Sequence, residues 1–180
     1  MVCLTGKLLP TGAMMSITLR NLIAGTALPL TFAVASTASA QTDSSFAALQ
    51  ARGKMAMGVD QYASAHQFDL TPSGGRIALE MKADDSLSVA QIRAHLKLIE
   101  HAFQAGDFST PEFVHLRAMP GTAVMSAKKD LIKYTYADLQ RGGEVRITTS
   151  DPEALAAIRE FIKAQRGDHH AGGHGGVPPN

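Results

Sequence analysis

The chain has 180 residues, with 17 Lys and Arg against 16 Asp and Glu and a formal net charge of +1. This length suits one domain plus a processed segment. A near-neutral chain has little sequence-independent attraction to phosphate backbones, so we expect no nucleic-acid partner. The single cysteine, Cys3, excludes an internal disulfide.

The first 40 residues are predicted to be a secretory signal peptide. Arg20 gives a basic start, residues 22–34 are apolar and rich in small side chains, and Ala38-Ser39-Ala40 fits a small-x-small cleavage site. Pro29 within the apolar stretch argues against a retained membrane anchor. Cleavage after residue 40 would leave 15 basic and 16 acidic residues and a net charge of −1. We therefore expect a periplasmic or secreted protein without a stable membrane anchor.

Two segments of the chain repeat one pattern at a constant offset of 68 residues. Each has a run of alternating apolar residues, a turn with a Gly-Gly pair, and a second alternating run. Alternation with period two predicts half-buried strands, and glycine supplies the positive φ of tight turns, so each segment is predicted to be a β-hairpin. The matching positions are His66-x-Phe68 with Gly74-Gly75, and Tyr134-x-Tyr136 with Gly142-Gly143.

A helix is predicted after each hairpin. Asp84-Asp85-Ser86 offers N-cap oxygens before an apolar stripe that runs from Val89 to Phe103. Asp151-Pro152-Glu153 begins the second helix, and Gly167 is its expected end. The predicted fold class is α+β, with two ββα units forming a four-stranded antiparallel sheet and two helices on one face. A homodimer assembled from the same units stays an open alternative.

The remaining segments complete the predicted domain organisation. Residues 41–53 are predicted to be a polar linker with about one helical turn, and residues 54–168 the folded domain. Lys54–Val59 alternates and predicts a short strand, while 107–130 is an insertion that the second unit lacks, with short helices near Thr110 and Ala123. The Gly- and His-rich residues 169–180 are expected to be a disordered tail.

Methionine and histidine side chains are the candidate metal ligands. Thioethers suit Cu(I), and imidazoles suit copper or zinc. A flexible His-rich tail can also bind these ions weakly. Methionine is equally common as a core residue, an inward histidine is often a hydrogen-bonded core residue, and the chain lacks the closely spaced ligand pairs of zinc motifs. The candidates are Met55, Met57, His66, His95 and His115 in the domain, and His169, His170 and His174 in the tail.

Three functions remain open on the sequence alone. The first is a small exported binding protein that handles a metal, most plausibly copper, or a small molecule. The second is an acid–base enzyme, hydrolase-like, in which Asp60 orients His66 and His115 faces both. The third is a non-catalytic module that binds a protein partner through the open face or edge of the sheet. The relative positions of His66, His95 and His115 discriminate between the first two.

Several motifs together resemble a family of uncharacterised bacterial proteins, many of which are exported. They are Met57-Gly58-Val59-Asp60-Gln61, His66-x-Phe68, Gly74-Gly75-x-Ile77, Gln91-Ile92-Arg93-x-His95-Leu96, Gly106-Asp107-Phe108, Tyr134-Thr135-Tyr136 and Asp151-Pro152-Glu153-Ala154-Leu155. The likeness covers about residues 51–169 and implies export, but it brings no reaction or ligand. Related chains carry a second histidine where this chain has Gln67, which weakens a two-histidine metal site at the first hairpin.

Overall fold

The computed structural model describes the backbone of residues 36–171 and the side chains of residues 45–171. The signal-peptide prediction falls mainly on residues 1–35, outside the described residues, and so does His174. Within the described part of the chain, no helix is both long and apolar enough to cross a membrane.

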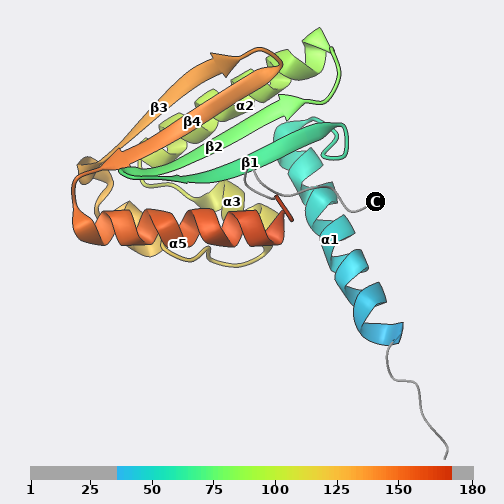
Figure 1. Cartoon of the computed structure of the whole chain (residues 1–180), viewed down its shortest axis with the longest axis horizontal. Helices are drawn as coiled ribbons and strands as arrows, with labels where there is room; N and C mark the ends of the chain where they lie inside the picture. Colours follow the sequence, from blue (N-terminus) through green and yellow to red (C-terminus); the bar gives the residue numbers. More distant parts are fainter. Residues whose placement is uncertain (1–35, 172–180) are drawn as a thin grey trace, which may run out of the picture. The chain divides into compact units, whose positions relative to one another are not determined.

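Two β-hairpins form one four-stranded antiparallel sheet with the strand order β1-β2-β4-β3, as Figure 1 shows. At the centre of the sheet, Ile77 pairs with Val145. On either side of it, Gly75 pairs with Ile147 and Leu79 pairs with Gly143. These two pairs are equivalent, because Gly75 corresponds to Gly143, and Leu79 to Ile147, at the offset of 68 residues. The two hairpins are therefore related by an approximate two-fold axis, and the predicted fold class is confirmed. The strands are β1 (Ser64–Thr71), β2 (Gly74–Met81), β3 (Ile132–Leu139) and β4 (Gly142–Thr149).

The helices that follow the hairpins, α2 (Ser86–Gln104) and α5 (Pro152–Asp168), each cover mainly the hairpin of the other unit. Helix α2 follows β2 but packs on β3 and β4, whereas α5 follows β4 and packs on β1 and β2. Arg93 of α2 donates to the carbonyls of Leu139 and Gly142 at the β3–β4 turn, and Arg159 of α5 donates to the carbonyl of Pro72 at the β1–β2 turn. This crossing joins both units in a single core.

The core lies between the sheet and these helices. Phe161 is fully buried on α5, and its ring meets those of Phe103 and Phe108 edge-on. The insertion forms two short helices, α3 (Ser109–His115) and α4 (Thr122–Ala127), with a 3-10 turn at Lys129–Leu131. Helix α3 packs on α1, and α4 packs on α5. The short helices expected in the insertion are confirmed.

The strand predicted at residues 54–59 is wrong, because helix α1 (Ser36–Met57) runs through most of that stretch and through the expected linker at 41–53. The buried residues Leu49, Gly53 and Met57 are four apart, which is a helical spacing. On a helix, residues two apart point to different sides. Accordingly Met57 is 7% exposed, whereas Met55 is 68% exposed.

Candidate functional site

A cavity with a volume of about 90 Å³ lies between the sheet and helices α1, α2, α3 and α5. Most of its lining is apolar, from side chains such as Phe68, Leu96 and Phe161. Such a volume holds several waters or a small ligand. Four imidazoles also line it, and we call it the histidine cavity: His66 from β1, His95 from α2, His115 from α3, and His169 just after α5.

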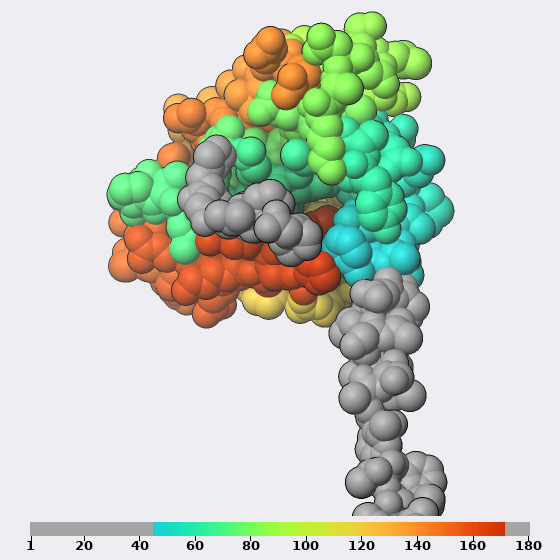
Figure 2. Space-filling model, turned by 45° about the vertical axis from the view of Figure 1, so that its right-hand side comes forward, coloured from blue at the N-terminus to red at the C-terminus, as the bar shows by residue number. Residues whose placement is uncertain are grey.

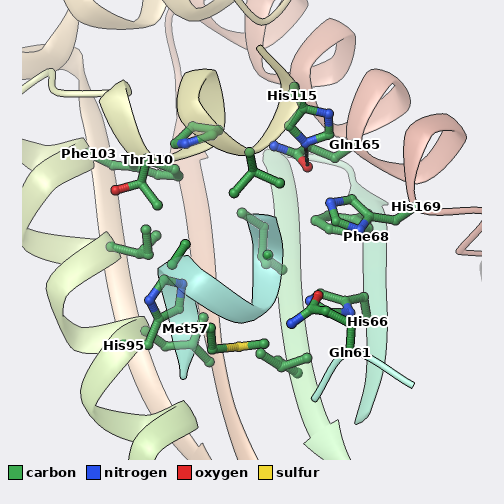
Figure 3. A pocket seen from close by; sticks show the side chains of 18 of the residues that line it. Met57, Gln61, His66, Phe68, His95, Phe103, Thr110, His115, Gln165 and His169 are labelled. Atoms are coloured by element: carbon green, nitrogen blue, oxygen red, sulfur yellow. Dashed lines mark hydrogen bonds between the residues drawn. The ribbon is translucent and has the colours of Figure 1, made fainter. Parts of the chain in front are cut away.

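Local structure explains why each histidine faces the cavity. His66 is two residues from the buried Phe68 on β1 and therefore points to the same face of the sheet. His95 is next to the buried Leu96 on α2. His115 is the last residue of α3 and is 8% exposed. In Figure 3, His66, His115 and His169 lie along one side of the cavity and His95 lies across from them.

His169 is the centre of an aromatic cluster. Its ring stacks on His66 at a centroid distance of 5.0 Å and on Phe68 at 5.3 Å, while His115 meets it edge-on at 5.2 Å. The prediction that the chain is disordered from residue 169 is therefore wrong for residues 169–171.

The chain beyond α5 is held by the hydrogen bonds of a helix C-terminal motif. The backbone N–H of His170 donates to Gly167, and that of Ala171 donates to Arg166, the pattern of a Schellman motif. His170 occupies the left-handed position, φ 50°, that such motifs usually give to glycine. Helix α5 thus ends at Asp168, one residue after the predicted Gly167, and His169 is its C-cap.

Burial keeps the four imidazoles neutral at pH 7. It lowers the pKa of His66 to about 4, with a further contribution from His95, and the pKa of His169 to about 3, with further contributions from His66 and His115. Burial also lowers the pKa values of His95 and His115. A neutral imidazole has one N–H donor and one lone pair, so the cavity offers both hydrogen-bond roles.

Asp168 and Gln165 of α5 fix the ring of His115. Nδ1 of His115 lies 2.8 Å from an Asp168 carboxylate oxygen, at contact distance but without the alignment of a hydrogen bond. The Asp168 charge counteracts part of the pKa lowering at His115 and favours the tautomer with its proton on Nδ1. Nε2 lies 3.0 Å from Oε1 of Gln165, so with the proton on Nδ1 the Gln165 amide has to turn over to present its NH₂ group. Gln165 is not among the site residues predicted from the sequence. The sequence feature that could have indicated it is a polar residue within the apolar stripe of a helix.

The structure brings together five of the predicted metal ligands, Met57, His66, His95, His115 and His169. Met55 is exposed and lies outside the cavity lining, and His170 stacks instead on Phe46 of α1. Within the described part of the chain, no group of three or more His, Cys, Asp or Glu side chains is arranged to hold a metal ion.

The expectation that Asp60 orients His66 is wrong. Asp60 is exposed, its Oδ1 accepts the backbone N–H of Tyr62, and its Oδ2 lies 3.9 Å from Lys54. It does not line the cavity. The carboxylate beside a cavity histidine is Asp168, which contacts His115 rather than His66.

Comparisons of the chain with protein-family models, with curated proteins and with solved structures gave no match.

Proposed function

We propose that this protein binds a small, uncharged, largely apolar molecule in the histidine cavity. One observation supports this proposal above all: four neutral imidazoles, from four separate segments of the chain, line one apolar cavity. Protein interiors are close-packed with few voids, and an apolar pocket with a few convergent polar groups of shifted pKa is the usual form of a ligand site.

The lining defines the chemistry of the ligand. None of the lining residues, all of which belong to the described part of the chain, carries a formal charge when its histidines are neutral. A charged ligand would lose its hydration without a counter-charge, so an uncharged one is favoured. Hydrogen bonds are available from the imidazoles and from Gln61, Thr110 and Gln165. Nδ1 of His169 is buried without a hydrogen-bond partner in the described part of the chain, and a ligand hydroxyl can satisfy it.

Ligand-observed NMR with phenol and benzyl alcohol, against benzoate and benzylamine, tests the proposal at pH 7.5. We expect the two uncharged compounds to bind with a Kd on the order of 10⁻⁴ M, from the affinity that so few ligand atoms can give. Ala56 lines the cavity, so Ala56→Leu should abolish binding by filling it, whereas the exposed-site control His101→Ala should not. Equal binding of charged and uncharged compounds, or full binding to Ala56→Leu, would contradict the proposal.

Copper binding is a second candidate, favoured by one observation. The Met57 side chain lines the same cavity as unprotonated imidazoles, whose lone pairs are then available to a soft metal at pH 7. Binding would require the stacked rings of His66 and His169 to turn, since no three-donor group is formed in the described residues.

Cu(I) competition with a chelator tests this second candidate on a chain that keeps His169 and carries His174→Ala. Met57→Leu should weaken binding at least tenfold, whereas Met55→Leu, the exposed neighbour on the same helix, should leave it unchanged. A Kd weaker than about 10⁻⁵ M in the parent chain would remove copper as a ligand of the cavity.

A further inference from the structure

The three residues after α5 connect two walls of the histidine cavity. His169 stacks on His66 and Phe68 of β1, while the ring of His170 stacks on Phe46 of α1 at 4.3 Å with an interplanar angle of 3°. Figure 2 shows the red C-terminal end of α5 beside the cyan surface of α1. We call residues 169–171 the C-terminal clasp.

We propose that the C-terminal clasp is the gate through which the ligand reaches the histidine cavity. The identity of that ligand rests on the proposed function, whereas the closure of the cavity by the clasp does not.

The position of the clasp supports this role, because it borders both the cavity and an open groove. The groove has a volume of about 330 Å³ and is lined by residues of α1, including Phe46 and Arg52, and by Asp168 and His170. His169 faces the cavity and His170 faces the groove. Consecutive residues of one segment therefore border the two spaces, together with His115 of α3, which lines both.

The attachments of the clasp are few and local. Beyond ring stacking and the packing of Ala171 against the core, its backbone is held by three hydrogen bonds to the last turn of α5, from His169 to Gln165, from His170 to Gly167 and from Ala171 to Arg166. Two features weaken the closed state: the left-handed backbone of His170, which non-glycine residues rarely adopt, and the buried, unpartnered Nδ1 of His169. Release of the clasp from its ring stacks therefore opens the cavity, while the last turn of α5 stays in place, held to β1 by Arg166 and to the insertion by Asp168.

Carbethoxylation of histidine at pH 7, followed by mass spectrometry, tests the gate without any ligand. The reagent diethyl pyrocarbonate modifies neutral, accessible imidazoles, and the exposed His101 serves as the internal reference. We compare the full chain with chains ending at Ala171 and at Asp168. In the first two, His66 should react at least tenfold more slowly than His101. In the chain ending at Asp168, the rate at His66 should rise at least tenfold.

Point variants keep the test independent of truncation effects on folding. Phe46→Ala and His170→Ala remove the same ring stack from opposite sides, so each should raise the His66 rate severalfold, and the double variant should add little to either. An unchanged His66 rate in all these variants would overturn the gate, and so would a His66 rate equal to that of His101 in the full chain.

A parallel phenol titration separates the two proposals. If phenol binds, its exchange rate should increase in the chain ending at Asp168. If phenol binds to no form of the protein, the proposed function fails, while the reagent rates still decide whether the clasp controls access.

Discussion

Replacing His66 with phenylalanine should make the free energy of unfolding depend less on pH below neutrality. Burial holds the pKa of His66 at about 4, whereas an unfolded chain has the ordinary value near 6.5. Between these values the unfolded state binds a proton that the folded state does not, so the free energy of unfolding falls as the pH drops below 6.5. The slope is about 1.4 kcal/mol per pH unit for one group, and the loss between pH 7.5 and 4.5 is about 2–3 kcal/mol.

Phenylalanine is the suitable replacement because it can keep the stacks on Phe68 and His169 without titrating. Urea denaturation of the wild type and His66→Phe at several pH values measures the difference. The variant should lose about 2–3 kcal/mol less than the wild type over that range. His101→Phe, at an exposed position, should follow the wild type. Parallel curves for the wild type and His66→Phe would refute the claim that a neutral His66 is buried in the cavity.

Four further substitutions test the fold by urea denaturation at pH 7.5. Asp151→Ala removes the N-cap of α5, whose carboxylate accepts a backbone N–H, and should cost about 1 kcal/mol; no loss would contradict the capping role. Gly142→Ala should cost more than about 2 kcal/mol, because a Cβ there would lie 1.9 Å from the Leu79 carbonyl oxygen. Gly167→Ala, with nothing within 4 Å, should instead stabilise by up to about 1 kcal/mol, and equal effects of the two glycine variants would contradict this packing. Phe161→Ala should cost about 3–5 kcal/mol, since this ring is fully buried; a loss under 1 kcal/mol would contradict its central place.

The parts of the fold that the sequence predicts are those with local signals. Each hairpin carries a Gly-Gly pair between alternating runs, and the helix after each hairpin is capped by an aspartate, Asp85 for α2 and Asp151 for α5. Turn and cap chemistry depends on neighbours within a few residues, so it can be recognised from sequence. The interpretation of residues 54–59 failed because Met55, Met57 and Val59 fit a strand alternation, while the helical spacing that includes Leu49 and Gly53 extends further back.

The candidate site was predicted only in part because it depends on contacts between distant segments. The inward parity of His66 and the place of His95 beside the α2 stripe are local properties, and both histidines line the cavity. His169 looked like part of a polar tail, since its burial comes from stacking on a strand about a hundred residues earlier. The pairing of His115 with Asp168 likewise joins the insertion to the end of α5, and no spacing within either segment indicates it.

The most direct test of the account is an NMR titration of the imidazole signals with phenol. The account predicts that His66, His95, His115 and His169 titrate with pKa values below the ordinary one, and that saturating phenol shifts their ring signals while that of His101 stays in place. Ordinary pKa values at these four rings, or ring signals that phenol leaves unchanged, would contradict a ligand cavity lined by neutral histidines.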